Sequence, residues 1–458
     1  MLQPPELKMQ QHPNVLYIHS HDTGRYVSPY GAPVESPNIQ AFAEAGVMFR
    51  HAFSVAPVCS ASRAGLLTGQ WAHVAGMNGL ANFKEDIAGP ENPGLEISFS
   101  LLDYGRHLVT TLKEAGYVTA LSGIQHVDGP FEDTSVYGSR IGYDHVLTRE
   151  DKRHRWDHRR VTERAVEFLG KAPKDQPFFL SVGFSETHTP FSPARERDDA
   201  RYIQPPAPLP DEERVREDFA DFRATVRRLD EQVGEVLDAL RASGQEENTL
   251  VILATDHGIP FPRMKCNLFD AGIGVMLMMR GPGPFSGGKT IEPMVSQIDV
   301  FPTLCDFLDI PRPDHLQGES LLPLVEGKTD QVRDELFAEV TFHDKYEPLR
   351  CIRTERWKYI RCFHENGGQS ADPTRTRELF EEAGWFEEDQ PRERLYDLWA
   401  DPTETCNLAG DPAYTQIQTD LMARLDHWMR DTGDPLLNGP LMVDGQPREI
   451  PGMAVRRV

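Results

Sequence analysis

Apolar runs of strand length recur along the chain and alternate with longer stretches of helical periodicity. The clearest runs are Val15–Ile18, Val118–Leu121, Phe178–Val182 and Leu250–Ala254. Continuous apolar runs of this length predict strands that are buried on both faces, as in a parallel sheet. Because helical stretches separate the runs, we expect an α/β fold in which helices sandwich a large, mostly parallel sheet.

The boundaries of several elements can also be predicted from the pattern. A Ser-Pro pair opens the segment Ser36–Gly46 and predicts a helix there, with the proline in the first turn. A charge-rich stretch of amphipathic spacing predicts a long helix over Asp211–Ser243. Further along, we expect a buried strand over Val275–Met279 and a helix over Ser296–Leu308.

The pattern changes after Asp334, where the apolar runs become shorter and a final helix is expected at about Thr415–Met429. We therefore divide the chain into a large α/β domain over residues 1–334 and a smaller α+β domain over residues 335–458, which closes the cleft. The charged segment 367–390 could face a substrate, but we interpret it as a solvated loop.

Composition narrows the function classes. The chain carries 48 basic and 71 acidic residues, a formal charge of −23, which argues against a nucleic-acid surface. Any site for an anion must therefore be locally positive. The polar start of the chain, residues 1–13, and the absence of a long apolar run predict a cytoplasmic protein with no membrane partner. Loss of an export signal stays open as an alternative.

One short segment carries most of the chemical information. Cys59 and Arg63 enclose the sequence CSASR, and the sequence LLTG follows at residues 66–69. Cys59 opens an expected short helix, and Arg63 lies one turn later on the same face. A cysteine and an arginine at this spacing alone would indicate an ordinary buried cysteine. The LLTG tail makes the pattern much more specific.

This segment resembles the signature of the type I sulfatases, C-x-(P/A)-x-R followed by x-x-L-L-T-G. The resemblance implies an alkaline-phosphatase-like fold. It also implies that a formylglycine-generating maturation enzyme converts Cys59 to formylglycine. The hydrated aldehyde of that residue is the nucleophile in the family, and Arg63 helps to hold it.

Two apolar runs end in side chains that can bind a metal. The first is followed by His21 and Asp22, and the fourth by Asp256 and His257. Ligands collect at the carboxyl ends of parallel strands. The resemblance implies that these four residues, together with the oxygen made at Cys59, surround one divalent metal ion. His21 departs from the family pattern, which has an aspartate there.

The identity of the metal stays open between two classes. Ca²⁺ is the family default, and it is a hard ion that prefers oxygen ligands. The imidazoles of His21 and His257 shift the preference toward Mn²⁺, zinc or iron. We expect His21 itself to be a metal ligand.

Three more segments match family motifs and imply catalytic roles. His126 falls on the histidine of a G-K-x-H motif that assists release of sulfate from the nucleophile. His188 opens an H-x-P-F turn and is the candidate general acid at the bridging oxygen of the substrate. Lys265 follows Asp256 at the position of a sulfate-binding lysine.

Ile124 stands where the family has a lysine in the G-K-x-H motif. Losing a cation beside an anionic substrate lowers transition-state stabilisation unless another cation replaces it. We expect such a replacement in the substrate-binding site, with Arg25 as the first candidate and Arg350 as the second.

The resemblance covers nearly the whole chain, and residues 68–80 are similar to the N-sulfoglucosamine sulfatase branch. It implies hydrolysis of a sulfate ester or sulfamate on a small molecule or oligosaccharide, most naturally a sugar. Two alternatives stay open: a phosphonate monoester or phosphodiester hydrolase of the same superfamily, and a catalytically degenerate protein that only binds sulfated glycans. The sequence leaves the oligomeric state open.

Overall fold

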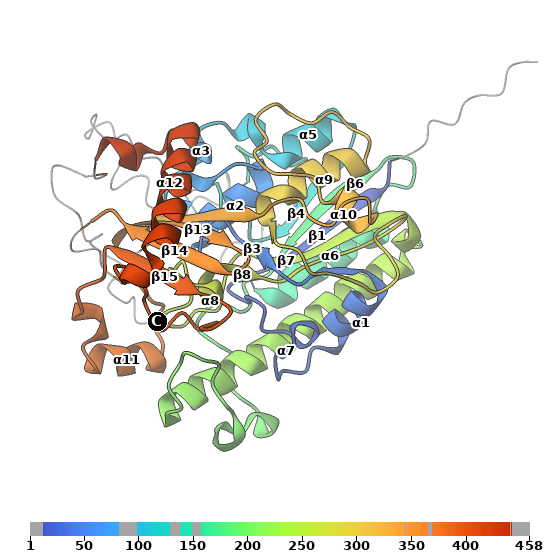
Figure 1. The fold of residues 1–458 in the computed structure, drawn as a ribbon. Coiled ribbons are helices and arrows are strands. Elements are labelled where there is room, and N and C mark those ends of the chain that lie inside the picture. Colours follow the sequence, from blue (N-terminus) through green and yellow to red (C-terminus); the bar gives the residue numbers. More distant parts are fainter. Residues whose placement is uncertain are drawn as a thin grey trace, which may run out of the picture.

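The computed structural model describes residues 12–81, 99–128, 138–148, 157–343, 345–364, 369–439 and 441. Within them the largest element is an eight-stranded sheet (Figure 1). Its strands, in spatial order, are β10 (Lys289–Ile291), β2 (Val47–Phe49), β9 (Leu277–Arg280), β7 (Thr249–Thr255), β1 (Asn14–Ser20), β6 (Phe178–Gly183), β4 (Val118–Gly123) and β5 (His145–Val146). All of them run in the direction of β1 except β9.

The central strands are buried on both faces, as their apolar sequences predict. Every residue of β1, β6 and β7 is buried. Leu16 and Ile18 pack into the core on one face of the sheet, and Val15 and Tyr17 pack into the core on the other. The predicted α/β fold with a mostly parallel sheet is therefore confirmed.

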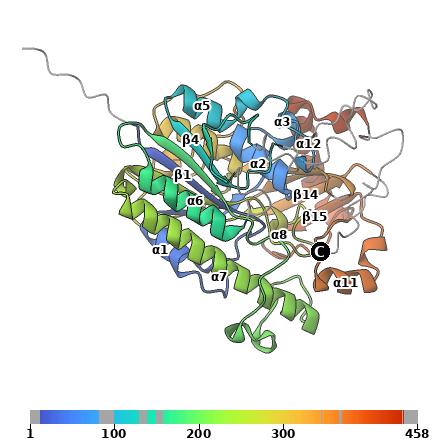
Figure 2. The same cartoon turned by 180° about the vertical axis from the view of Figure 1, so that it is seen from behind.

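Helices cover both faces of this sheet (Figures 1 and 2). One layer contains α1 (Pro37–Ala45), α6 (His158–Lys171) and α7 (Glu213–Ala242). The other contains α2 (Cys59–Thr68), α5 (Leu108–Glu114) and α9 (Val300–Phe307). The helices expected near Ser36–Gly46 and Asp211–Ser243 are confirmed as α1 and α7. The one expected over Ser296–Leu308 is a 3-10 turn, Gln297–Asp299, followed by α9.

The single strand expected over Val275–Met279 is wrong. The chain there forms β8 (Gly274–Val275) and then β9, with Met276 between them. The amide of Met276 donates to the carbonyl of Gly24 at 2.8 Å, which diverts the chain from one sheet to another. Strand β8 belongs to a small sheet with β3 (Ala52–Phe53) and β11 (Val295–Ser296).

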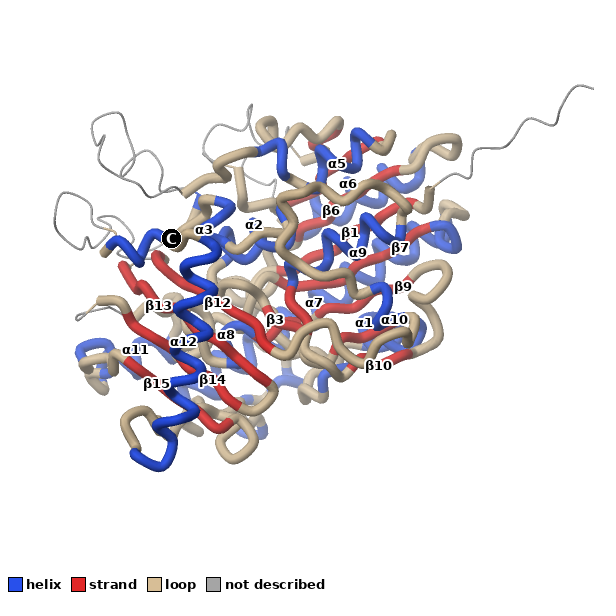
Figure 3. The backbone as a smooth tube through the Cα atoms, turned by 45° about the horizontal axis from the view of Figure 1, so that its top comes forward, coloured by secondary structure: helices blue, strands red, loops and turns tan. Residues whose placement is uncertain are grey.

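The C-terminal part contains a four-stranded antiparallel sheet. Its strands are β12 (Glu335–Phe342), β13 (Tyr346–Thr354), β14 (Trp357–Cys362) and β15 (Glu393–Asp397). Helix α12 (Thr415–Thr432), which extends past its expected end, lies across these strands (Figure 3). Strand β12 begins directly after residue 334, and the division into two domains there stays a prediction.

The remaining helices of the described residues are short. They are α3 (Ala72–Ala75), α8 (Asp270–Ile273), α10 (Leu322–Val325) and α11 (Arg375–Glu382). Among the described residues, no helix combines the length and the apolar character needed to cross a membrane. Residues 1–11, on which the expectation of a missing export signal depends, lie outside the described ranges.

Candidate active site

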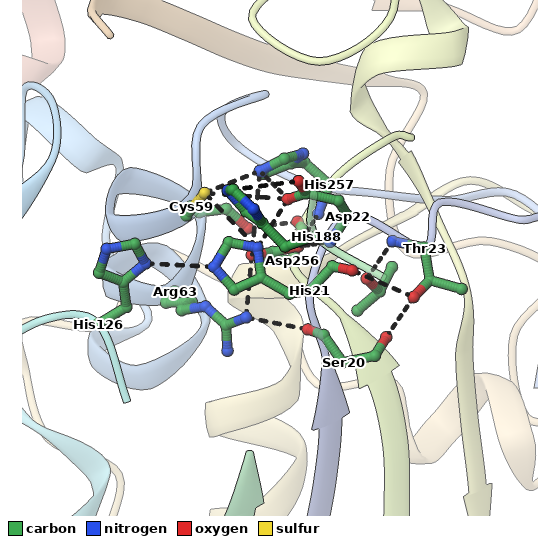
Figure 4. Close-up of polar contacts among 12 residues, drawn as sticks. Ser20, His21, Asp22, Thr23, Cys59, Arg63, His126, His188, Asp256 and His257 are labelled. Carbon is green, nitrogen blue, oxygen red and sulfur yellow. Dashed lines mark hydrogen bonds and ion pairs between the residues drawn. The ribbon is translucent and has the colours of Figure 1, made fainter. Parts of the chain in front are cut away.

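Two pairs of polar side chains lie next to each other at the carboxyl ends of the neighbouring strands β1 and β7. Ser20 pairs with Thr255 at the end of the parallel ladder, so the residues that follow each strand emerge side by side. His21 Nδ1 lies 2.7 Å from Asp22 Oδ1 and 3.5 Å from Asp256 Oδ2. His257 Nε2 lies 3.2 Å from Asp22 Oδ1. These four buried side chains converge on one point (Figure 4).

Backbone contacts hold the loop after β1 in this position. Asp22 has a φ of 56°, a left-handed conformation that aspartate tolerates better than most residues. Its amide donates to Asp256 Oδ1 at 2.8 Å, and the amide of His21 donates to the carbonyl of Glu186 at 2.7 Å. These hydrogen bonds tie the loop after β1 to the segments that follow β7 and β6.

Cys59 is the first residue of α2, as the sequence predicts, and it faces this cluster. Its Sγ lies 3.3 Å from His257 Nε2 and 3.8 Å from His21 Nδ1. Burial raises the pKa of the Cys59 thiol well above its usual range. The unmodified side chain is therefore a neutral thiol at neutral pH, which is a poor nucleophile.

Arg63 lies one turn further along α2 and contacts the cluster through Asp256 and the end of β1. Its Nη2 donates to Asp256 Oδ2 and to the carbonyl of Ser20, both at 2.9 Å. Burial by itself would raise the pKa of Asp256, but His257 and Arg63 hold it below its usual range. Asp256 is therefore ionised, and Arg63 fixes its orientation.

Lys265 connects the cluster to the C-terminal part of the chain. Its Nζ donates to Asp22 Oδ2 at 2.8 Å and to Asp372 Oδ2 at 2.7 Å. Burial would lower the pKa of Lys265, but these two carboxylates raise it well above its usual range. The buried lysine is therefore a fixed positive charge in the cluster.

Two further histidines face the same point. His188 Nδ1 donates to the carbonyl of Thr189 at 2.7 Å, so its Nε2 faces the cluster, 3.9 Å from Asp22 Oδ2. His126 Nδ1 lies 3.4 Å from His21 Nε2. Nitrogen atoms of His21 and His126 lie within 4.8 Å of each other and of the Cys59 sulfur. Burial lowers the pKa of His21 to about 4, so its ring is neutral and can act as a ligand.

The donor set fits a metal ion. One atom each of His21, Asp22, Cys59 and Asp256 lies within 4.8 Å of the others. Two ionised carboxylates that face each other with little solvent contact need cations between them. The neutral imidazole of His21 and the nearby Nε2 of His257 supply nitrogen donors to the same point.

Nine of the residues predicted for the site are brought together, and their individual roles stay predictions. They are His21, Asp22, Cys59, Arg63, His126, His188, Asp256, His257 and Lys265.

Arg25 was expected in the substrate-binding site as the cation that replaces the lysine missing at Ile124, but it lies elsewhere. Gly24 turns the chain with a φ of 55°, and its carbonyl is tied to the amide of Met276. Arg25 therefore points to another cavity, which it lines with Asp270 and Arg353. Its Nη2 donates to the carbonyl of Ala52 at 2.7 Å. It does not replace the lysine missing at Ile124.

Arg350 is likewise corrected as a substrate-binding residue. It is fully buried, and its Nε donates to Asp434 Oδ2 at 2.5 Å. It also lies 3.4 Å from Glu339 and donates to the carbonyl of Val340. These contacts join β12, β13 and the residues after α12, so Arg350 has a structural role.

A cavity of about 470 Å³ opens from the cluster. Some of the residues that line it were not predicted from the sequence as site residues. His21, His126, His188 and Ile124 line one part of it. The residues that line the rest include His158, Glu186 and Arg228. Arg228 Nη1 lies 3.7 Å from Glu186 Oε1 and 3.4 Å from His158 Nδ1. Arg228 is one of many charged residues on α7, so no local signal distinguishes it.

Asp372 is the second residue that the sequence analysis missed. Residues 369–372 are buried, so interpreting the whole charged segment as a solvated loop is wrong at this point. The Oδ2 of Asp372 lies 3.7 Å from His188 Nε2 in addition to its contact with Lys265. The sequence separation of 107 residues between Lys265 and Asp372 hides this contact from any local pattern.

Two family models together match most of the chain, as do several known proteins. The family model described as "Sulfatase" matches residues 13–310, more than half of the chain. A second model, described as "N-sulphoglucosamine sulphohydrolase, C-terminal", matches residues 263–385. Human N-sulphoglucosamine sulphohydrolase is 29% identical over 93% of this chain and 92% of its own length. An ulvan-active sulfatase of Formosa agariphila is 26% identical over 94% of this chain and 76% of its own length.

Solved structures share the fold. A 2-O glycosaminoglycan sulfatase matches with a TM-score of 0.69 and 22% identity, covering 96% of both chains. A protein in complex with its substrate, D-glucosamine-2-N,6-O-disulfate, matches with a TM-score of 0.69 and 18% identity over 94% of this chain and 99% of its own.

Proposed function

This chain belongs to the sulfatase family, and from that premise we propose that it hydrolyses a sulfate ester or sulfamate of a sugar with a formylglycine made from Cys59. The observation that carries the proposal is the position of Cys59 at the start of α2, against His257 and the two ionised aspartates. A buried neutral thiol could not attack sulfur efficiently there. A hydrated aldehyde at that position supplies a hydroxyl nucleophile instead.

We propose that His21, Asp22, Asp256 and His257 hold one divalent metal ion beside that nucleophile. Such an ion supplies positive charge to the sulfate oxygens and to the nucleophile. Two imidazoles with two carboxylates favour Mn²⁺ or another transition ion over Ca²⁺, which prefers an all-oxygen set.

The chain's own residues then have distinct tasks. Lys265 supplies a fixed charge for a sulfate oxygen, because burial and two carboxylates keep it protonated. The hydrogen bond from His188 Nδ1 to Thr189 leaves Nε2 as the atom that can pass a proton to the departing group. His126, close to the position of the nucleophile, can accept a proton when sulfate is released.

The sugar substrate is supported by the relatives. The human relative is named for N-sulfoglucosamine, and the Formosa relative for ulvan. A choline-sulfatase of Rhizobium meliloti is also similar, at 27% identity. Because the relatives are named for both sugars and choline, membership of the family does not by itself fix a sugar as the substrate.

Rates on three substrate classes test the proposed function. Protein co-expressed with a formylglycine-generating enzyme should hydrolyse phenyl sulfate and sulfated sugars such as N-sulfoglucosamine faster than the phenyl ester of phenylphosphonic acid, a phosphonate monoester. A higher rate on the phosphonate would favour a phosphonate or phosphodiester hydrolase. Binding of sulfated glycans without turnover, in protein that carries the modification, would favour a binding protein.

Replacing His21 with alanine should weaken metal binding by about 100-fold or more. Loss of an outer partner of a metal ligand alone costs roughly 10–100-fold in affinity, and His21 Nδ1 faces both aspartates. Isothermal titration of Mn²⁺ into metal-free protein measures the effect. The matched control is His51→Ala, which changes a half-exposed histidine beside Glu292. If His21→Ala binds Mn²⁺ as tightly as this control, His21 is not a ligand.

Replacing Arg228 with alanine should raise KM for a sulfated sugar by about tenfold or more. Arg228 lines the same cavity as Ile124, and a hydrogen bond to a charged group contributes roughly 1.5–3 kcal/mol. Arg241→Ala, which changes an exposed arginine on the same helix, should leave KM unchanged. Equal KM values for the two variants would show that Arg228 does not contact the substrate.

A further inference from the structure

A buried carboxylate from the C-terminal part of the chain lies against the side chains of Lys265 and His188. Asp372 precedes α11 and reaches Lys265 and His188, which come from two separate loops of the large sheet. Its Oδ2 lies between the lysine Nζ, at 2.7 Å, and the histidine Nε2, at 3.7 Å. It therefore lies beside the two side chains proposed to contact the sulfate oxygens and the leaving group.

This position is unfavourable for a substrate that presents only a sulfate. Asp372 competes with the sulfate for Lys265 and repels its negative charge. Lys265 does not need a second carboxylate to stay in place, since Asp22 Oδ2 already accepts from Nζ at 2.8 Å. A buried charge in such a position lowers affinity unless a group on the substrate pairs with it.

The second oxygen of Asp372 is available for such a group. Lys265 and His188 both contact Oδ2. Within the described part of the chain, Oδ1 takes no hydrogen bond. A carboxylate oxygen can accept up to two further hydrogen bonds and offers none, so its partner must be a donor.

We propose that Asp372 is a specificity-determining residue that accepts a hydrogen bond from a hydroxyl or ammonium group beside the sulfated atom of the substrate. This inference rests on the proposed function. It defines the substrate class as a sulfated compound with a vicinal donor, as in many sugars and amino sugars. In this proposal, the carboxylate of Asp372, from the C-terminal part of the chain, recognises the substrate group next to the bond that is hydrolysed.

Three aryl sulfates with closely related leaving groups test the proposal. Phenyl sulfate has no donor, catechol monosulfate has a neighbouring hydroxyl, and 2-(aminomethyl)phenyl sulfate has a neighbouring ammonium. We expect Asp372→Asn to lower kcat/KM by about 10–100-fold on whichever donor substrate the wild-type protein prefers. On phenyl sulfate, KM should stay equal or fall, because a repelling charge has been removed. The donor substrate that loses more identifies the natural donor.

The controls separate this role from a structural one. Glu381→Gln removes an exposed carboxylate of α11 and should change none of the three rates. Asp372→Glu keeps the charge and should retain part of the preference for the donor substrate. If the Asp372→Asn variant fails to fold, Asp372→Glu becomes the test variant. The expected result is then a change in the ratio of kcat/KM between the donor substrates and phenyl sulfate.

An equal loss on all three substrates would overturn the proposal, because it would mean that Asp372 only positions Lys265. Equal kcat/KM values of the wild-type protein for phenyl sulfate and both donor substrates would also overturn it. Failure of the proposed function looks different. In that case the modified wild-type protein would hydrolyse none of the three sulfates.

Discussion

Cys59→Ala is expected to lower hydrolysis of any sulfate substrate by about 10⁴-fold or more, which is the largest effect that a single substitution should have. The side chain lies 3.3 Å from His257 Nε2 and faces the proposed metal ligands, so alanine removes the proposed nucleophile. Cys59→Ser should be equally inactive unless the maturation enzyme accepts serine. Initial rates at saturating substrate measure the loss.

Intact mass provides the matched readout. Conversion of Cys59 to formylglycine lowers the mass by about 18 Da, and Cys59→Ala should abolish that shift. Cys406→Ala changes the exposed cysteine and should retain both the shift and the activity. Full activity of protein that lacks the mass shift would contradict the proposed nucleophile.

Arg63→Ala should have the second largest effect, on both stability and turnover. The guanidinium donates to Asp256 Oδ2 and to the carbonyl of Ser20, and both partners are buried. Removing one member of a buried ion pair leaves an uncompensated charge and typically costs about 3–5 kcal/mol. Turnover should fall by at least about 100-fold, because Asp256, a proposed metal ligand, loses the group that fixes its orientation.

Urea unfolding with and without Mn²⁺ measures the stability effect. We expect a larger loss in the presence of a chelator, since a bound cation would partly neutralise Asp256. Arg160→Ala removes an exposed arginine of α6 and should change stability by less than about 0.5 kcal/mol. A midpoint for Arg63→Ala equal to that of Arg160→Ala would contradict the role assigned to the Arg63–Asp256 pair.

Much of the site could be predicted because its residues stand at the ends of locally recognisable elements. The apolar runs that became β1 and β7 are buried strands, and parallel strands in register bring the residues after them together. Cys59 and Arg63 lie on one face of a helix, which their spacing alone implies. The structure placed these residues within contact distance, and their roles stay predictions that the experiments above test.

The failures have a common cause. Arg25 follows Asp22 closely in the chain, but a left-handed glycine and a bond to Met276 direct it into another cavity. Arg350 matches a family motif, but Asp434 and Glu339 hold it in a buried ion pair. Each outcome depends on partners distant in sequence, which periodicity does not specify.

By itself, the sequence determined the α/β architecture and indicated the candidate nucleophile and the candidate metal ligands, because burial periodicity and short motifs are local properties of the chain. Only the tertiary structure decided which other charged side chains lie next to these residues. Arg228 and Asp372 come from a helix and a C-terminal segment whose side chains reach the site through folding alone. The physical reason is that a charge acts through space over a few ångströms, whereas a sequence records only distance along the chain.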